Sequence, residues 1–94
     1  MGKPRYTAPD SNQNDIIHAL NQIPALDVID LREVGDDCPD VLIGYAGVNY
    51  LVEIKTPTGR MKPGQIRHFE EWPGQTAIAR SLDDVLKIIG VEFT

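Results

Sequence analysis

The apolar positions of the chain group into stretches of helical and of strand-like spacing. The first group recurs at helical spacing and comprises Ile16, Ile17, Leu20 and Ile23. This spacing predicts an amphipathic helix over about residues 11–23, with Asp10 or Ser11 as its N-cap and Pro24 at its end. Residues 1–10 carry two prolines and no apolar periodicity, so we expect an N-terminal arm there.

Three strands are expected next. Residues 26–31 are short, branched and partly alternating, which is typical of a strand. Residues 35–39 form a loop, and residues 41–52 are almost entirely apolar and predict two further strands. Ala46-Gly47 is the favoured turn between these two strands, although it lacks the Asn-Gly signature of a tight hairpin.

The second half of the chain begins with a break at residues 56–59. Pro63 suits the first turn of a helix that runs to about Trp72. Residues 76–79 are a short apolar run, for which we expect a buried strand.

A last helix follows that strand. Ser81 is its expected N-cap, Asp84 stands at the capping-box position, and Gly90 ends it. Its apolar stripe is formed by Leu82, Val85, Leu86 and Ile89. The predicted order is therefore helix, three strands, helix, strand, helix, in a single α/β domain over residues 11–94.

Composition limits the function classes. The 94 residues suit one small domain, and the net charge of −5 argues mildly against a nucleic-acid partner. Four basic residues nevertheless fall close together in the sequence, at Lys55, Arg60, Lys62 and Arg67. No apolar run is long enough to span a membrane, no secretory signal is recognisable, and Cys38 is alone. We therefore expect a cytoplasmic protein without a membrane partner or a disulfide.

The expected hairpin brings chemistry-bearing residues together. If Ala46 and Gly47 are the turn, Asp40 is opposite Glu53, with Cβ atoms about 4.5–5.5 Å apart. Two such carboxylates repel each other unless a cation lies between them, and hard oxygen ligands suit Mg²⁺ or Mn²⁺. Side chains alternate along a strand, so Lys55 shares the face of Glu53. A shift of one residue in the turn would remove Asp40 from that face.

Phosphodiester hydrolysis is the chemistry that such a group supports. A metal held by Asp40, Glu53 and the main-chain carbonyl of Ile54 would polarise a phosphate and lower the pKa of a bound water. Lys55 would hold or help to deprotonate that water, or stabilise developing negative charge. Glu-x-Lys on a strand is ordinarily a solvated ion pair, and Pro-Asp ordinarily starts a turn. Their combination at hairpin spacing is much rarer.

These residues resemble a known nuclease signature. Pro39-Asp40 followed by Glu53-Ile54-Lys55 resembles the PD-(D/E)XK pattern. Residues 49–55, followed by the segment 61–72 that contains Gln65, resemble more narrowly the VRR-NUC branch. The resemblance runs from about Asn12 to Ile89.

The resemblance implies a fold and an activity. The fold would be restriction-endonuclease-like, an αβββαβ core with a C-terminal helix, its central mixed sheet flanked by helices. The activity would be that of a divalent-metal-dependent DNA endonuclease, often acting on branched or flapped DNA. Stand-alone members of this branch resemble Holliday-junction resolvases and tend to be homodimers.

The resemblance also implies roles for single residues. Asp40 and Glu53 would be metal ligands, Lys55 the catalytic lysine, and Gln65 a residue that touches the lysine or the substrate phosphate. The family usually has a Glu on the first helix, and Asp15 stands at the matching place. As a metal ligand Asp15 would be one methylene shorter, and an exposed helix acid is the alternative reading.

Further DNA contacts are expected in and after the loop that follows the catalytic strand. Arg60 and Lys62 are the best phosphate contacts, with a merely solvated loop as the alternative. Arg67 and His68 are weaker candidates on the next helix, and a structural role is favoured for His68. Trp72 is more often a core anchor at such a helix end than a base-stacking residue.

Two function classes remain after the sequence has been considered. The leading hypothesis is a metal-dependent DNA endonuclease. Its rival is a non-catalytic nucleic-acid-binding or assembly module that keeps the nuclease fold. A third class, an acidic protein-interaction domain, leaves the opposition of Asp40 and Glu53 unexplained.

Overall fold

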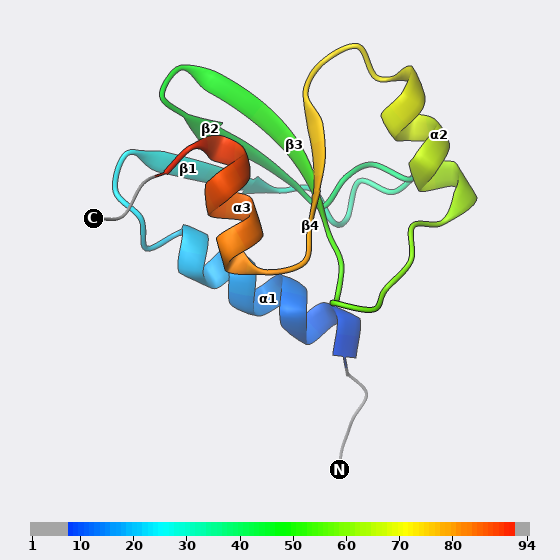
Figure 1. Cartoon of the computed structure of the whole chain (residues 1–94), viewed down its shortest axis with the longest axis horizontal. Helices are drawn as coiled ribbons and strands as arrows, with labels where there is room; N and C mark the ends of the chain where they lie inside the picture. Colours follow the sequence, from blue (N-terminus) through cyan, green and yellow to red (C-terminus); the bar gives the residue numbers. More distant parts are fainter. Residues whose placement is uncertain (1–7, 92–94) are drawn as a thin grey trace.

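A computed structural model describes residues 8–91 of the protein, with side chains from Asn12 onward. The order of its elements confirms the predicted order (Figure 1). The elements are α1 (Ala8–Leu20), β1 (Leu26–Asp30), β2 (Val41–Tyr45), β3 (Val48–Ile54), α2 (Pro63–Glu71), β4 (Thr76–Ala79) and α3 (Leu82–Ile89).

The strands form one mixed sheet in the order β1-β2-β3-β4. The first three strands are antiparallel neighbours, and β4 is parallel to β3. A parallel pair cannot be joined by a tight turn, so the chain leaves the sheet after β3 and returns through α2. This crossover places the α2 helix beside the end of the strand that carries Glu53.

The turn between β2 and β3 fixes the register of the hairpin. Ala46 and Gly47 both have positive φ, 53° and 82°, as a type I′ turn requires. Tyr45 then pairs with Val48, and the ladder runs to the pair Val41–Val52. The predicted turn and register are therefore confirmed.

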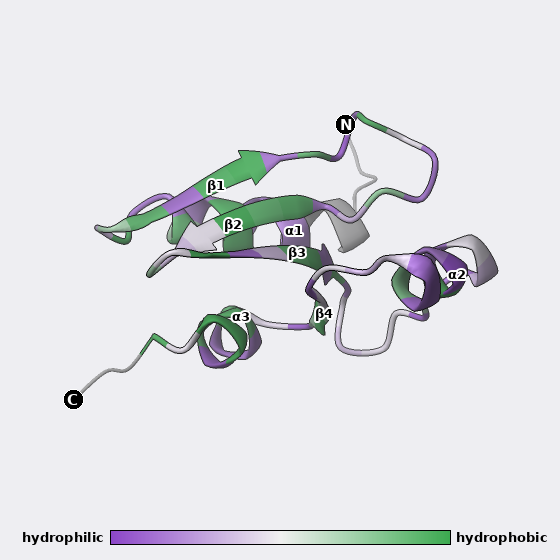
Figure 2. Cartoon of the chain, turned by 90° about the horizontal axis from the view of Figure 1, so that it is seen from above, coloured by the Kyte–Doolittle hydropathy of each residue, from purple (hydrophilic) through white to green (hydrophobic). Residues whose placement is uncertain are grey.

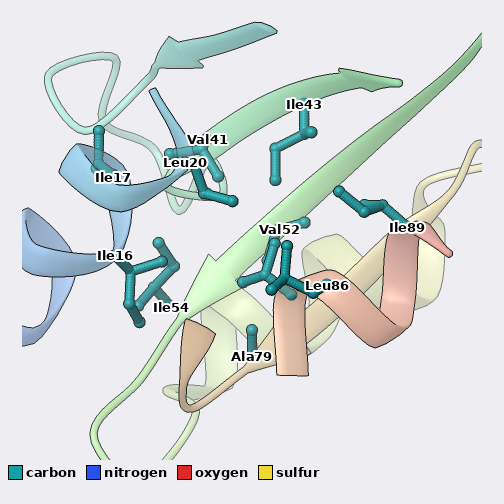
Figure 3. Close-up of a cluster of buried hydrophobic side chains, with 11 residues drawn as sticks. Ile16, Ile17, Leu20, Val41, Ile43, Val52, Ile54, Ala79, Leu86 and Ile89 are labelled. Atoms are coloured by element: carbon teal, nitrogen blue, oxygen red, sulfur yellow. The ribbon is translucent and has the colours of Figure 1, made fainter. Parts of the chain in front are cut away.

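The hydrophobic core lies between the sheet and two of the three helices. Val41, Ile43, Val52 and Ile54 are buried on one sheet face by alternation along their strands. Helices α1 and α3 cover that face, as Figure 3 shows. The residues that they bury are Ile16, Ile17, Leu20, Val85, Leu86 and Ile89. Both predicted apolar stripes are thus core positions, with Ile23 and Leu82 packed at the edge.

Helix α2 is attached differently. None of its residues is buried, and it lies apart from α1 and α3 (Figures 1 and 2). Pro63 occupies the first turn, as predicted. Trp72, at its C-terminal end, has an exposed fraction of 46%, so the core-anchor interpretation is wrong. Helix α2 is therefore held by contacts other than core packing.

The boundaries of α1 differ from prediction. The helix begins at Ala8, so Asp10 and Ser11 lie inside it and are not its N-cap. Proline is tolerated in a first helical turn, which allows Pro9 to lie in the helix although it suggested an arm. The predicted arm therefore ends earlier, and its residues 1–7 lie outside the described residues. The helix ends at Leu20, ahead of Pro24.

The C-terminal elements follow prediction with two differences. Ser81 caps α3 by accepting a hydrogen bond from the Asp84 amide at 3.1 Å, and Gly90 closes the helix with φ of 84°. The Asp84 carboxylate accepts from the Arg80 amide at 2.8 Å, one residue before the capping-box donor. Strand β4 buries only Ala79, because it is an edge strand. No helix among residues 8–91 is long and apolar enough to cross a membrane.

Candidate active site

The predicted site residues meet in a cleft of about 370 Å³ on the sheet face away from the core. The end of β3 supplies Glu53, and the residue before β2 supplies Asp40. The walls come from α1, from the loop after β3 and from the first turn of α2, and include Gln13, Arg60, Lys62 and Gln65. Five parts of the fold therefore position the cleft.

Asp40 lies just beyond the paired part of β2. It is 8% exposed, and its Oδ2 accepts a hydrogen bond from the Ile54 amide at 2.8 Å. The regular ladder ends at Val41–Val52, so the carboxylate provides a partner for an amide that β2 no longer pairs. This bond fixes Asp40 beside the end of β3, as the hairpin register predicts.

Glu53 is the more enclosed carboxylate, with an exposed fraction of 2%. Its Oε2 lies 3.4 Å from Lys55 Nζ and accepts a hydrogen bond from Gln65 Nε2 at 2.9 Å. Alternation along β3 places Glu53 and Lys55 on one face, as predicted, while Val52 and Ile54 enter the core on the other.

Burial makes both carboxylates difficult to ionise. Desolvation and, after it, the nearby Asp40 carboxylate raise the pKa of Glu53 to about 7, although the charge of Lys55 opposes the rise. Burial also raises the pKa of Asp40, against the hydrogen bond from Ile54 and the charge of Lys55. The cleft therefore contains too little positive charge to balance both carboxylates when they are ionised.

Gln65 joins α2 to this group. Its side-chain carbonyl accepts from the Lys62 amide at 2.9 Å at the helix N-terminus, while its amide nitrogen donates to Glu53. The sequence predicted a contact with Lys55 or a phosphate, and the structure places the contact on Glu53 instead. Helix α2 has no buried residue, so this bond is a direct tie between the helix and the sheet.

The residue that α1 contributes is Gln13 and not Asp15. Gln13 Nε2 lies 3.2 Å from Asp40 Oδ2 and 3.5 Å from the Ile54 carbonyl oxygen. Asp15 is exposed and outside the cleft lining, so its predicted role as a metal ligand or catalytic residue is not supported by its position. Positions two apart on a helix point about 200° apart, so only one of them can face the site.

Sequence reasoning missed Gln13, although a signal was present. Gln13 precedes Ile16 by three residues and Ile17 by four, and both of these are buried. Residues at such spacings share a helix face, so the apolar stripe of α1 already indicated which polar residue turns toward the sheet.

Asn12 and Arg80 hold the backbone around Lys55. Asn12 Nδ2 donates to the Lys55 carbonyl at 2.9 Å, and the Lys55 amide donates to the Ala79 carbonyl at 2.9 Å. Arg80 Nη1 donates to the carbonyls of Thr56 and Gly59, at 2.7 and 2.6 Å. The sequence did not single out either residue, because both act through main-chain atoms of a distant segment.

Comparison with known proteins bears on this arrangement. No family model matches the chain, and no curated protein matches it at a significant level. A solved structure described as a VRR-NUC domain superposes on 89% of this chain and 92% of its own, with a TM-score of 0.53 and 21% sequence identity. The protein has the fold of a VRR-NUC domain. The predicted fold class, a nuclease-type α/β fold, is therefore confirmed.

Within the VRR-NUC fold, the predicted DNA contacts fall into two groups. Arg60 and Lys62 line the cleft that holds Glu53. Arg67 and His68 do not line it, and their role as DNA contacts stays a prediction. Arg67 follows Gln65 by two residues, so the helix turns it away from Gln65. His68 instead packs against Trp72, with the ring centroids 5.4 Å apart.

The donor atoms of this VRR-NUC fold suit a hard divalent cation. The described residues contain no group of three or more His, Cys, Asp or Glu side chains placed to hold a metal. Asp40, Glu53 and the Ile54 carbonyl are the oxygen donors here, and Mg²⁺ commonly uses only one or two carboxylates together with water. The two buried carboxylates with raised pKa values fit such an ion, because its charge would offset their repulsion.

Proposed function

We propose that the protein is a divalent-metal-dependent endonuclease that hydrolyses phosphodiester bonds in DNA. The observation that carries this proposal is the pair of buried carboxylates, Asp40 and Glu53, beside the Lys55 ammonium in one cleft of a VRR-NUC fold. Structural ion pairs of this kind are usually solvated, whereas Glu53 and the Lys55 side chain are 3% and 15% exposed. Burying such a group costs free energy that a purely structural role does not require.

Mg²⁺ or Mn²⁺ is the proposed cofactor. Asp40, Glu53 and the Ile54 carbonyl would hold it, and when bound it would polarise a phosphate and lower the pKa of a bound water. The raised pKa of Glu53, about 7, means that the carboxylate is only partly ionised at neutral pH without a cation. Metal binding would therefore release protons from the site.

Lys55 and Gln65 would organise the reacting groups. The Lys55 ammonium is paired with Glu53 at 3.4 Å and lines the cleft, which suits stabilisation of negative charge on a phosphate. Gln65 holds the Glu53 carboxylate at 2.9 Å and so limits its rotation. Arg60 and Lys62, on the cleft wall, would bind neighbouring phosphates.

Structured or branched DNA, including flaps and four-way junctions, is the proposed substrate, and a homodimer is the proposed assembly. Both follow from the family resemblance. A described domain of this size offers little surface to grip a duplex, and a two-fold dimer would double that surface and match the symmetry of a four-way junction.

A cleavage assay tests the proposal. Labelled linear duplex, flap and four-way-junction DNA would be incubated with Mg²⁺, Mn²⁺ or a chelator. We expect cleavage only with metal, a loss of at least about a hundredfold in Lys55→Ala, and no detectable cleavage in Glu53→Ala. Asp15→Ala is the matched control, since Asp15 is an exposed acid on α1 and should leave the rate unchanged. Cleavage that survives both site substitutions would reject the assignment.

One observation favours the alternative, a non-catalytic nucleic-acid-binding or assembly module. Gln13 places a neutral amide against Asp40 and the Ile54 carbonyl, and Asp15, the acid that the resemblance offered on this helix, is exposed and outside the cleft lining. Binding of any of these DNAs without cleavage, in either metal, would establish the alternative.

A further inference from the structure

A second and larger cavity, of about 630 Å³, lies on the sheet face that also carries Glu53. Leu42 and Leu51 form its floor and are partners across β2 and β3. Trp72 and His68, from the end of α2, form a wall, and the amide side chains of Asn49 and Gln75 also line it. We refer to this space, whose lining includes these six residues, as the Trp72 cavity.

The indole of Trp72 is held in a fixed orientation and is still exposed. Its ring stacks on His68, with 12° between the planes, and its exposed fraction is 46%. The backbone at Gly74 approaches closely, since a Cβ there would lie 2.8 Å from the indole Nε1. An aromatic ring that is supported on one side and open elsewhere is suited to stacking on a second flat ring.

One ring nitrogen of His68 is an unsatisfied hydrogen-bonding atom. Its Nδ1 is buried and has no partner among the described residues. Such an atom normally has a partner, and leaving it without one costs free energy. His68, Asn49 and Gln75 give the otherwise apolar lining of the cavity a few polar residues, which is the usual character of a small-molecule site.

The Trp72 cavity and the cleft follow each other along β3 without sharing a lining residue. Leu51 precedes Glu53 by two residues on β3, about 7 Å along the strand. Bases stacked along one DNA strand are about 3.4 Å apart, so these two lining residues are about two base steps apart. Helix α2 joins the two sites as well, because Gln65 contacts Glu53 and Trp72 follows the helix.

The charge between the two sites suits a phosphate backbone. Residues 54–69 contain four basic residues and no acidic residue, in a chain whose net charge is −5. Arg60 and Lys62 line the cleft within this segment. Glu70 and Glu71 precede Trp72 immediately, and residues one or two apart on a helix do not face each other.

We propose that the Trp72 cavity binds an unpaired nucleobase of the DNA strand whose phosphate lies in the adjacent cleft. This inference rests on the proposed function and adds a preference for strands with an unpaired base near the cut. The base would stack on Trp72 and direct an edge toward the polar groups of the cavity. Every base has a flat face, so the cavity would select unpaired strands without reading sequence.

Fluorescence provides a direct test, because Trp72 is the single tryptophan of the chain. A five-nucleotide thymidine oligonucleotide would be titrated into the protein with a chelator present, so that no cleavage occurs. The comparison ligand is a strand of the same length that is abasic at all five positions. We expect the thymidine strand to quench Trp72 and to bind roughly ten- to hundredfold more tightly than the abasic strand.

Two substitutions locate the effect, with anisotropy of a labelled strand as the readout. Trp72→Ala should remove the difference between the two strands, whereas Ile78→Ala, an exposed apolar residue on β4, should preserve it. Trp72→Phe keeps a smaller ring and should retain part of the difference. Unchanged circular dichroism and melting temperature would show that Trp72→Ala is folded.

Several outcomes would overturn the inference. The first is equal affinity of the protein for the thymidine and abasic strands. The second is a Trp72→Ala protein that still distinguishes these strands as well as the wild type does. The third is thymidine monophosphate that binds as tightly as the whole strand. Trp72 emission that changes with protein concentration alone would instead assign this face to a second copy of the chain. If the protein distinguishes the two strands but cleaves no DNA in any metal, the nuclease proposal is rejected and the base site is kept. If Trp72→Ala cleaves flapped DNA as fast as the wild type, the base site alone is rejected.

Discussion

The Glu53 carboxylate shows how an arrangement that suits a cation disfavours the folded protein without one. Its side chain is almost fully buried, and it faces Asp40 with one ammonium nearby. The raised pKa, about 7 instead of 4.5, expresses this penalty. At the residue scale, the burial of Glu53 lowers the stability of the folded protein and favours the binding of a positive charge.

The penalty predicts a pH effect on stability. Between pH 4.5 and 7 the folded state holds a proton at Glu53 that the unfolded state releases, so the free energy of unfolding falls as the pH rises. The loss is on the order of 2–3 kcal/mol for this shift. The side chain in Glu53→Gln cannot ionise. Between pH 5 and 8, the free energy of unfolding of this variant should therefore fall by that amount less than the free energy of unfolding of the wild type.

Urea unfolding in the presence of a chelator measures this difference. The pKa of Asp40 is raised as well, and the two carboxylates influence each other, so the difference between the proteins reports Glu53 together with its interaction with Asp40. Equal changes with pH in the wild type and in Glu53→Gln would show that Glu53 ionises normally.

Gln13 is the second residue with a predicted effect. Gln13→Glu should place a third carboxylate beside Asp40 and the Ile54 carbonyl, since the Gln13 amide already lies 3.2 and 3.5 Å from their oxygens. Added ligand charge strengthens binding of a hard cation, so we expect at least about tenfold tighter Mn²⁺ binding. Isothermal titration calorimetry measures it directly.

Asp15 provides the comparison for this measurement. Asp15→Asn should leave Mn²⁺ affinity unchanged, because Asp15 is exposed and outside the cleft lining. A weaker affinity in Asp15→Asn, with none gained in Gln13→Glu, would restore the ligand that the sequence suggested.

At the scale of elements, the cleft depends on a loop that is anchored from the opposite side of β3. Arg80 follows β4, and its guanidinium donates to two carbonyls of the turn at residues 56–59. That turn directly follows Lys55 and leads to the basic residues of the cleft wall. A single side chain thus connects the end of β4 to the position of the loop.

Removal of this anchor has a predicted cost. Arg80→Ala leaves the Thr56 and Gly59 carbonyls without their donor, and we expect it to destabilise the protein by about 1–3 kcal/mol. Amide hydrogen exchange at Gly59 and Arg60 should become faster, because the turn loses its tether. Lys87→Ala, an exposed basic residue on α3, is the control and should change neither quantity. Unchanged amide exchange rates at Gly59 and Arg60 in Arg80→Ala would show that the turn is stable without the Arg80 hydrogen bonds.

Elements were predicted well wherever a local pattern decides them. The apolar stripes of α1 and α3, the turn at Ala46-Gly47 and the Ser81 cap are each set by residues close in sequence. The start of α1 was missed because the residues before Asn12 carry no apolar periodicity. The exposure of Trp72 was missed because it depends on α2 standing away from the core.

At the scale of the whole molecule, an acidic protein carries a basic strip beside its cleft. The net charge of −5 repels a phosphate backbone at long range, so binding must rely on a few short-range contacts. Arg60 and Lys62 line the cleft, whereas Arg67 is exposed outside its lining. This distribution predicts a small salt dependence that a few residues dominate.

Salt titrations of DNA binding test this distribution. The double substitution of Arg60 and Lys62 by Ala should reduce the slope of log K against log salt by up to about 2 for duplex DNA. Arg67→Ala, which changes the net charge without altering the cleft, should leave the slope nearly unchanged. A slope that falls equally in both proteins would mean that overall charge, and not the cleft wall, controls binding.

The sequence by itself determined the element order, the hairpin register and the neighbourhood of Asp40, Glu53 and Lys55. These features depend on side-chain periodicity and on a two-residue turn, which are local properties. Tertiary structure alone decided that Gln65 bonds Glu53 and that Trp72 stands open, and it showed that Gln13, which shares the helix face of Ile16 and Ile17, faces the cleft. Each of these depends on how a helix is rotated against the sheet, and packing over the whole chain sets that rotation.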